Sequence, residues 1–429
     1  MLRALNSRNY RLFFCGQIVS LVGTWMTTTA TSWLVYRLTG SSMMLGLVGF
    51  AGQFPAFLVS PLAGTLVDRW DRHRLLIATQ TISMAQSFAL AALTLSGRIT
   101  IPMVVGLSAL QGLVNAFDMP CRQAFLVQLV RKDELSNAIA LNSSMFNAAR
   151  LVGPSIAGGL IAAAGEGWIF LIDGFSYFAV MVALMVMRLP KSDAGMVNRS
   201  GVWSQVSEGW RYITGSRPLR SIMTLLALVS LVGFPYTVLM PVFASELLGG
   251  GPNTLGLLMA ATGCGALVGA LWLAARRSVL GLGRVIPLAA GLFGSALIAF
   301  SFSRVLWLSL AILVVSGFGF MVQMASSNTI IQTIVEDAKR GRVMSFYVMA
   351  FLGTAPFGSL LAGTLSARIG APHTLLIGGT CCIAAALWFA NGLPELRAAV
   401  RPIYVRLGIV REMTAGIQTA SDLMTPPED

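Results

Sequence analysis

Charged residues are scarce in this sequence. Asp, Glu, Lys and Arg make up 11% of the 429 residues, whereas hydrophobic residues make up 55%. A soluble domain of this length carries more charge on its surface. The apolar residues occur in continuous runs of about 20, the length of a helix that crosses a membrane. Within these runs, apolar residues do not alternate with polar ones as they do in the strands of a β-barrel. The sequence therefore predicts an all-α polytopic membrane protein.

Groups that hold metals or carry out covalent chemistry are also few. The two histidines, His73 and His373, lie at the ends of apolar runs, far apart in sequence. The cysteines form no CxxC pair and no Cys/His cluster, so no metal site or disulfide framework is expected. We find no nucleophile–base set and no phosphate-binding loop, and we expect a protein that is not an enzyme and has no cofactor. The cysteines all lie in or beside apolar runs: Cys15, Cys121, Cys264, Cys381 and Cys382.

Twelve membrane spans are expected. The longest polar interval, 189–218, lies between the sixth and seventh spans and divides the chain into an N-terminal six-helix bundle (1–188), an amphipathic linker (189–218), a C-terminal six-helix bundle (219–392) and a tail (393–429). The expected spans are 12–37, 44–67, 75–96, 102–129, 137–164, 168–188, 219–246, 253–275, 284–303, 305–333, 343–368 and 373–392.

The two halves resemble each other weakly. The segment VGPSIAGGLI (152–161) matches PFGSLLAGTL (356–365), so that Gly159 corresponds to Gly363. A duplicated six-helix unit explains this match and the central position of the linker. We therefore expect two pseudo-symmetric bundles.

The basic residues predict the orientation, because cytoplasmic loops of membrane proteins are rich in Lys and Arg. With both termini in the cytoplasm, almost all of the 30 basic residues fall on the cytoplasmic side. The short, basic segment 1–9 leads straight into the first span and predicts an uncleaved first helix. The net charge of +13 thus reflects topology, and no nucleic acid is expected as a partner. The basic residues expected outside are Arg37, Arg98, Arg304 and Arg368.

Two segments outside the spans are expected to lie along the cytoplasmic membrane surface. In the linker, apolar residues follow helical spacing from Trp203 to Ile213, as in an amphipathic interfacial helix. In the tail, arginines alternate with apolar residues from Arg397 onwards. Each pattern is typical of a lipid-facing anchor.

The stretch VDRWDRHR (67–74) joins the second and third spans and holds a dense group of charges. Together with Gly64, it resembles the signature loop of the major facilitator superfamily. The resemblance implies that Gly64, Asp68, Arg69 and Arg72 latch the cytoplasmic side when the central cavity opens outward. The family commonly has glycine where Asp71 stands, and the Asp-Arg-x-Asp-Arg version is similar to the branch of enterobactin exporters and macrolide efflux proteins. The equivalent loop of the second half, GALWLAARRS (269–278), has no acid, so the expected latch is one-sided.

Two further stretches carry the branch resemblance. NAFDMPCRQAFLVQLV (115–130) and NAARLVGPSIAGGL (147–160) resemble the fourth and fifth spans of that branch. Gly153 and Pro154, followed by Gly158 and Gly159, resemble the antiporter motif of exporting members. Three residues separate the proline from the paired glycines here, against two in the family.

Charged residues inside a membrane are costly and tend to be functional. Asp118 on the fourth span and Arg150 on the fifth lie at similar depths, since each residue of a helix adds about 1.5 Å. Arg122 follows Asp118 by one turn and can share its carboxylate. We expect these three residues to form a cluster facing the cavity, either as a proton-coupling site or as an ion pair that only fixes helix packing.

A basic residue that many drug exporters carry on the fourth span is absent. Gln111 and Gly112 of their Arg-x-x-Gln-Gly motif remain, but Ser108 occupies the arginine position. We expect Arg150 to replace that arginine. Asp173 in the sixth span is open to a packing or a gating role, and Glu166 and Glu246 at outer span ends are expected to be solvated.

The resemblance implies that the first, fourth, seventh and tenth spans line a central cavity. Amide, hydroxyl and aromatic groups on these spans suit bulky amphipathic compounds, whereas sugars or small ions require more fixed polar groups. The expected cavity residues are Gln17, Thr24, Trp25, Thr28, Asn115, Asn147, Phe234, Tyr236, Gln323 and Asn328.

Three functions remain open at this stage. The first is export of small amphipathic molecules, such as siderophores or antibiotics, by proton antiport from a monomer in the bacterial cytoplasmic (inner) membrane. The second is import, or movement of lipids, on the same fold. The third is a membrane sensor or scaffold that transports nothing. The expected partners are a small-molecule substrate and the lipid bilayer.

Overall fold

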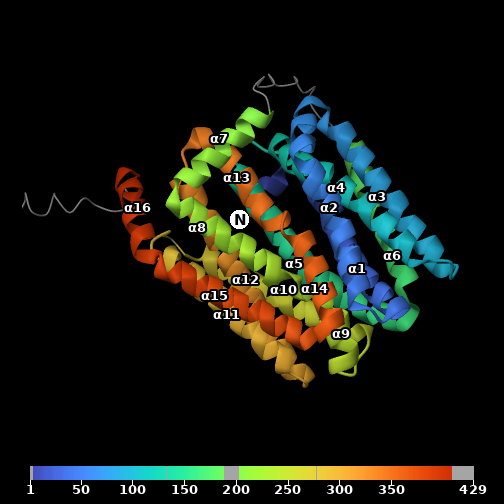
Figure 1. The fold of residues 1–429 in the computed structure, drawn as a ribbon. Helices are drawn as coiled ribbons and strands as arrows, with labels where there is room; N and C mark the ends of the chain where they lie inside the picture. Colours follow the sequence, from blue (N-terminus) through green and yellow to red (C-terminus); the bar gives the residue numbers. More distant parts are fainter. Residues whose placement is uncertain (1–2, 132, 188–201, 277, 408–429) are drawn as a thin grey trace, which may run out of the picture.

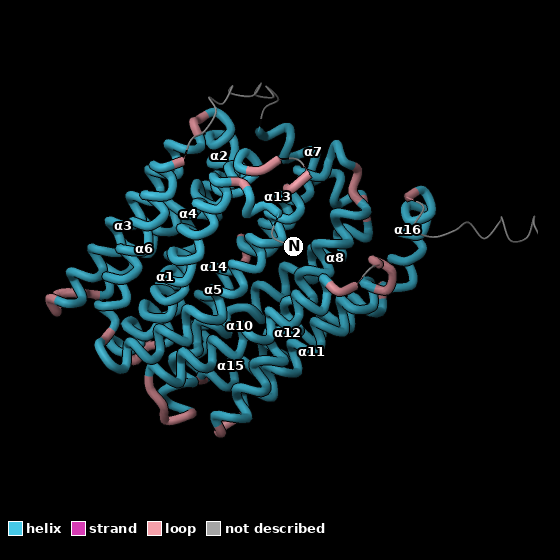
Figure 2. The backbone as a smooth tube through the Cα atoms, turned by 180° about the vertical axis from the view of Figure 1, so that it is seen from behind, coloured by secondary structure: helices cyan, strands magenta, loops and turns pink. Residues whose placement is uncertain are grey.

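The computed structural model describes residues 3–131, 133–187, 202–276 and 278–407. Within these ranges the chain forms helices joined by turns and contains no strand (Figure 2). The helices form two halves, which Figure 1 shows in blue to green and in light green to red. The expected all-helical, two-bundle fold is confirmed.

The N-terminal half contains six long helices after a short 3₁₀ helix at Arg3–Asn6. Side-chain caps begin several of them: Ser7 caps α1, Ser41 caps α2 and Asp71 caps α3. Such caps satisfy amide groups that have no partner in the first turn. The helices are α1 Arg8–Thr39, α2 Ser42–Arg69, α3 Arg72–Leu95, α4 Ile101–Leu129, α5 Leu135–Ala164 and α6 Glu166–Val186.

The second half follows the linker helix α7. Its elements are α7 Val202–Gly215, α8 Arg217–Leu228, η2 Val229–Gly233, η3 Phe234–Leu239, α9 Met240–Val242, η4 Phe243–Leu247, α10 Pro252–Ala274, α11 Leu282–Phe302, α12 Leu306–Ile334, α13 Asp337–Leu352, α14 Ala355–Ile369, α15 Ala371–Asn391 and α16 Leu393–Arg406.

Eleven stretches of the described helices are long and apolar enough to cross a membrane. The remaining expected span corresponds to α5, which has 30 residues and so is about 45 Å long. Asn137, Asn142, Asn147 and Arg150 lower its hydropathy. Length, more than composition, thus places α5 among the spanning helices.

The seventh and eleventh spans are broken, although the sequence predicts each as one helix. The seventh runs as α8, a π-helical turn, a 3₁₀ turn, the short α9 and a second π-helical turn. Pro235 and Pro241 lie in this stretch, and each removes an amide donor and crowds the preceding turn. The eleventh is interrupted between α13 and α14, where Gly353 and Thr354 precede a segment beginning Ala-Pro. Hydrogen bonds from Ser230 to Phe351 O (2.6 Å) and from Thr354 to Ala227 O (3.4 Å) join the two broken spans.

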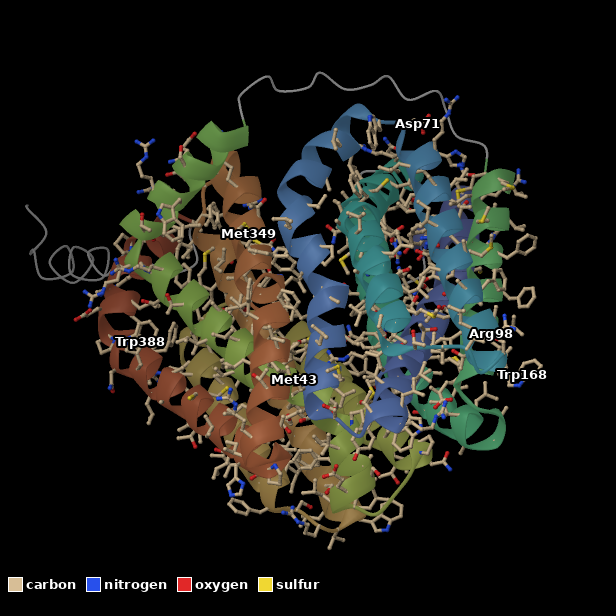
Figure 3. The ribbon with its side chains drawn as sticks, turned by 45° about the vertical axis from the view of Figure 1, so that its right-hand side comes forward. Met43, Asp71, Arg98, Trp168, Met349 and Trp388 are labelled. Atoms are coloured by element: carbon tan, nitrogen blue, oxygen red, sulfur yellow. The ribbon has the colours of Figure 1, made fainter. Side chains whose placement is uncertain are left out.

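The two halves are pressed together at one end through paired glycines. On α5 and α10, a Cβ placed at Gly158 would meet Gly256 Cα at 3.0 Å; on α2 and α14, a Cβ placed at Gly46 would meet Gly363 Cα at 2.9 Å. These helix pairs are equivalent under the proposed duplication. Toward the other end, where α7 and Asp71 lie, the halves diverge (Figure 3). We call this second end the linker end.

The linker helix α7 rests on α13 of the second half. Arg342 pairs with Glu208 at 2.5 Å, the rings of Trp210 and Phe346 lie 6.0 Å apart, and Lys339 lies over the ring of Tyr212. Ile213 is buried, whereas Trp210 is 59% exposed. Part of the apolar face of α7 therefore packs against the second half, whereas most of the Trp210 side chain is exposed. The side chains of Trp203 and Val206 lie outside the described residues.

Candidate functional site

Asp118 lies in the middle of α4 and is 3% exposed. It forms an ion pair with Arg122, one turn further along α4. Thr79 Oγ1 and Gln80 Nε2 of α3 each donate a hydrogen bond of 2.9 Å to its Oδ1. This carboxylate therefore has both a cation and two neutral donors, and the cluster fastens α3 to α4.

Arg150 does not join that cluster, and this part of the prediction is wrong. Its guanidinium lies 5.7 Å from the ring centroid of Trp25 on α1, and its electrostatic neighbour is Tyr236 of the second half. The prediction assumed that α4 and α5 are neighbours because a short connection joins them. Instead, α4 packs against α2 and α3, whereas α5 packs against α1 and α10. Among the described residues, no acid pairs with Arg150.

Asp173 of α6 is the second buried acid of the first half, at 1% exposure. Its donors are hydroxyl groups: Thr27 Oγ1 of α1 and Ser87 Oγ of α3 each reach Oδ2 at 2.9 Å, and Ser176 Oγ reaches Oδ1 at 3.3 Å. The described residues supply no cationic partner. Asp173 thus connects three helices through neutral groups alone, in contrast to Asp118.

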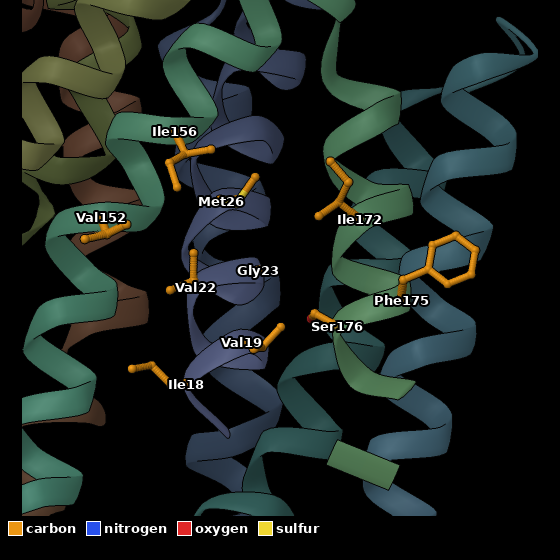
Figure 4. Close-up of a pocket in the computed structure, with 10 residues that line it drawn as sticks. All are labelled: Ile18, Val19, Val22, Gly23, Met26, Val152, Ile156, Ile172, Phe175 and Ser176. Carbon is orange, nitrogen blue, oxygen red and sulfur yellow. The ribbon is translucent and has the colours of Figure 1, made fainter. Parts of the chain in front are cut away.

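Gly23 of α1 provides the space for this acid. A Cβ at Gly23 would lie 2.5 Å from Asp173 Oδ1 and 2.7 Å from Ser176 Oγ. Gly23 and Ser176 also line an apolar groove of about 580 Å³ between α1, α5 and α6 (Figure 4). The hydroxyl of Ser176 therefore stands between the carboxyl of Asp173 and an apolar surface.

One turn from Asp173 along α6, Tyr177 lies beside Thr24, with the two oxygens 3.4 Å apart. Thr24 is one of the expected cavity residues, and it precedes Trp25, on which Arg150 rests. Three consecutive residues of α1 therefore contact these groups: Gly23 lies beside Asp173, Thr24 beside Tyr177 and Trp25 beneath Arg150. The sequence identified Asp173 by its charge in an apolar run, but no signal in it paired the acid with hydroxyls on two other helices.

The expected cavity residues divide into two groups in the structure. Two of them contact aromatic rings: the ring centroids of Phe234 and Phe320 lie 5.3 Å apart, and those of Trp25 and Phe146 lie 5.7 Å apart. The buried group is packed between helices: Gln17, Asn147, Tyr236 and Gln323. The group that keeps part of its surface exposed is Thr24, Trp25, Thr28, Asn115, Phe234 and Asn328.

The predicted gate lies mostly outside what the structure describes, because the surroundings of Gly64 and the side chains of Asp68 and Arg69 are not described. The backbone carbonyl of Arg72 accepts a hydrogen bond from Cys121 Sγ at 3.3 Å. Asp71 is the N-cap of α3, and its Oδ1 accepts the Arg74 amide at 3.1 Å. An acid at this position therefore has a local role, because it satisfies an amide and faces the positive end of the helix dipole.

The glycines of the antiporter-like motif face two different helices. A Cβ at Gly153 would meet Trp25 Cβ at 2.6 Å on α1, whereas Gly158 faces Gly256 on α10. Pro154 O lies 2.6 Å from a Cβ placed at Gly256, and Gly159 has Asn253 as its nearest neighbour at 3.9 Å. The motif thus brings α5 close to both halves at once.

Of the two acids expected to be solvated, Glu246 is exposed as expected, whereas Glu166 is buried; both have specific partners. Glu166 is 5% exposed and accepts hydrogen bonds from Arg37 at 2.8 and 3.1 Å. Glu246 accepts a hydrogen bond of 2.7 Å from Tyr36, which joins the first half to the second. Sequence reasoning missed both contacts, since the partners lie on helices far apart in the chain. Among the described residues, no group of three or more His, Cys, Asp or Glu is placed to hold a metal ion.

The sequence matches a family described as transmembrane secretion effector over residues 2–403, which is nearly the whole chain. The chain belongs to this family of the major facilitator superfamily. The recognition based on the signature loop is thereby confirmed, and the chain is a transporter-family protein and not an enzyme.

Curated relatives of this transporter include proteins with named cargoes. The staphyloferrin A transporter of Staphylococcus aureus is 28% identical over 395 residues, covering 90% of this chain and 97% of the relative. The multidrug efflux pump Tap of Mycolicibacterium fortuitum is 28% identical, covering 82% and 88% of the two chains. Macrolide efflux protein A of Streptococcus pyogenes is 23% identical, covering 88% and 95%.

Solved transporters share the fold at low sequence identity. A bacterial homolog of the human lysosomal transporter Spinster aligns with a TM-score of 0.68 and 14% identity, covering 93% of this chain and 98% of that one. A POT family transporter in complex with 5-aminolevulinic acid aligns with a TM-score of 0.73 and 9% identity, covering 91% and 97%. These matches establish the architecture of the transporter.

Proposed function

We propose that this transporter exports small amphipathic molecules, such as siderophores or antibiotics, across the bacterial cytoplasmic membrane. The observation that carries the proposal is similarity, over 82–88% of the chain, to a protein named as a multidrug efflux pump and one named as a macrolide efflux protein. The partly exposed aromatic and amide groups on α1, η3 and α12 fit the same class of cargo. The density of basic residues supports an orientation with both termini in the cytoplasm.

Alternating access is the mechanism that the packing supports. The halves touch through Gly158–Gly256 and Gly46–Gly363 at the end away from the linker, and they diverge at the linker end. With the linker in the cytoplasm, this is an inward-facing arrangement. Glycines on both sides of each contact allow the helices to approach closely and to separate without leaving interlocked side chains.

We assign cargo binding to Arg150 and its aromatic neighbours. This guanidinium lies over Trp25 and next to Tyr236, which belongs to the other half. A charge inside a membrane protein is costly unless it is paired or reaches water. A carboxylate or carbonyl oxygen of the cargo would supply the missing acceptor, and the cargo would then contact both halves.

Proton coupling is the second part of the proposal, and the two buried acids differ in how well they suit it. The charge of Asp118 is already balanced by Arg122, so neutralising Asp118 would leave a partly buried guanidinium without its anion. The hydroxyl partners of Asp173 can donate to the ionised form, and one of them can turn to accept from the neutral form. We therefore propose Asp173, and not Asp118, as the acid that gains and loses the proton.

The position of Asp173 connects its protonation to the movement of α1. It lies seven residues into α6, or about 10 Å along the helix from the end away from the linker. Its Thr27 contact lies on the same helix as Trp25. A proton entering from the outside would rearrange the Thr27 and Ser87 hydrogen bonds, and its release to the cytoplasm would restore them. Each proton moving down a potential of 100 mV supplies about 2.3 kcal/mol.

Transport assays in everted vesicles test the function directly. Export from cells appears there as uptake into the vesicle, driven by an imposed proton gradient and abolished by an ionophore that collapses it. A cargo that moves in the opposite direction would show an importer, and the absence of movement for every siderophore and antibiotic tried would leave the sensor or scaffold function. Asp173→Asn should lose gradient-driven uptake. Asp133→Asn, which replaces an exposed acid between α4 and α5, should keep it.

A further inference from the structure

A second groove lies on the side of the C-terminal half that faces away from the N-terminal half and from the proposed transport site. It has a volume of about 620 Å³ and lies between α11 and α15, where α16 begins. Figure 1 shows these helices side by side, with α16 continuing from the end of α15. The groove therefore opens toward the surrounding bilayer.

The part of the groove away from its two arginines is lined by apolar residues. Gly291 and Ala386 lie between the two helices, where the closest heavy atom to a Cβ placed at Gly291 is Ala386 Cβ at 3.9 Å. Leu288, Leu292 and Leu387 form the walls and are 72%, 40% and 60% exposed. The small residues thus leave a depression between larger ones, and its surface suits a hydrocarbon chain.

Two arginines stand at one mouth of the groove. Arg284 lies in the first turn of α11, and Arg397 lies near the start of α16; both line the groove and both are exposed. Neither makes an ion pair with a described residue, whereas the nearby acid Glu395 is paired with Arg217. α16 is held by Leu396 and Val400, which are buried, so that Arg397 is directed away from the core.

The mouth lies at the linker end, where α11 starts and α15 finishes. By the distribution of basic residues this is the cytoplasmic side, where anionic phospholipids attract Lys and Arg by about 1 kcal/mol for each residue near the surface. Basic pockets between spanning helices on this side hold anionic lipid headgroups in other membrane proteins. The two arginines match the phosphate of such a lipid, and the apolar groove beside them matches an acyl chain.

We propose that this groove is a binding site for an anionic glycerophospholipid of the cytoplasmic leaflet. Arg284 and Arg397 bind the phosphate, and one acyl chain lies along Gly291 between α11 and α15. The bound lipid fastens α16 to the membrane surface and fills the depression between the two helices. This inference does not depend on the transported cargo or on the proton site.

Native mass spectrometry of the full-length protein tests the site. The protein is released from nanodiscs that contain equal amounts of phosphatidylglycerol and phosphatidylcholine, and the bound lipids are counted. The wild type should retain one phosphatidylglycerol in preference to phosphatidylcholine. Arg284→Gln with Arg397→Gln should weaken that preference by about 30-fold, since two surface arginines each contribute about fivefold.

Gly291→Leu tests the acyl-chain part separately, because its Cβ would meet Ala386 Cβ at an ordinary contact distance of 3.9 Å and the rest of the side chain would occupy the groove. It should lower retention of both lipids at this site. The matched controls are Arg74→Gln, an exposed arginine on the other half, and Gly106→Leu, where nothing lies within 4 Å. Both controls should retain the lipid as the wild type does.

Three results would overturn the proposal. One is equal retention of the two lipids by the wild type, and another is a loss in the Arg74→Gln or Gly106→Leu control as large as in the groove variants. The third is a dimer whose abundance falls in Gly291→Leu, which would show that a second copy of the chain covers the groove. Elution of each variant as a monodisperse peak establishes that it is folded.

Discussion

Adding one methyl group at Gly256 should open the contact between the halves. In Gly256→Ala, the new Cβ would lie 2.6 Å from Pro154 O and 2.9 Å from Gly158 Cα, and both atoms belong to the backbone of α5. Backbone atoms cannot rotate away as a side chain can, so the two helices must separate. Overpacking of this kind costs about 1–3 kcal/mol, which corresponds to a shift of about 5- to 150-fold between two conformations.

The shift can be measured as a change in distance at the linker end. Spin labels at positions 74 and 220, both exposed and on different halves, are introduced into a variant without the five native cysteines. Pulsed electron paramagnetic resonance measures the distance between the two labels. The parent protein should show mainly long distances, and Gly256→Ala should show a larger fraction of short ones, because closing the linker end accompanies opening the other end. Gly106→Ala, placed in open space, should leave the distribution unchanged. An unchanged distribution in Gly256→Ala would refute the inward-facing interpretation of the glycine contacts.

Four further predictions follow from the side-chain contacts. Arg122→Gln should lower stability by about 3–5 kcal/mol, because it leaves the carboxylate of Asp118 buried without its cation; thermal unfolding in detergent measures this, and a change below about 1 kcal/mol would contradict it. Gly23→Ala should reduce transport at normal expression, because its methyl group displaces the buried carboxyl; transport at the wild-type rate would contradict this. Asp71→Ala should destabilise α3 by about 0.5–2 kcal/mol through loss of its N-cap, with Asp71→Asn as the control that keeps an acceptor. Arg150→Gln should raise the KM for an anionic cargo more than for an uncharged one, and an equal change for both would exclude a direct contact.

The sequence is sufficient to predict the membrane-spanning, two-bundle fold. The lengths of the apolar runs and the charged loop after Val67 indicate the architecture and the superfamily, and both are confirmed. The breaks at Pro235 and between Leu352 and Ala355 were not predicted, although their Pro and Gly residues are visible in the sequence. Whether a proline bends a helix or divides it depends on neighbouring helices that can satisfy the freed backbone groups, and here Ser230 and Thr354 provide such contacts.

The candidate site was harder to predict because its contacts join helices that are distant in the chain. Counting residues along each span predicts similar depths for Asp118 and Arg150, but depth does not specify which helices pack together. Pairing Asp118 with Arg122 needed only the spacing of one turn. Two of the three hydroxyl partners of Asp173, Thr27 and Ser87, lie on other helices, 146 and 86 residues away, and a lone sequence contains nothing that links them to the acid.

The most direct test of the account is proton-driven transport by Asp173→Asn in proteoliposomes. With an imposed pH gradient, the wild type should accumulate cargo and move protons in the opposite direction. Asp173→Asn should still exchange labelled for unlabelled cargo at equal concentrations, but it should neither accumulate cargo nor move protons. Asp118→Asn should keep proton-coupled accumulation when its rate is measured per folded protein. Accumulation by Asp173→Asn at the wild-type rate would contradict the proposed role of this carboxyl group.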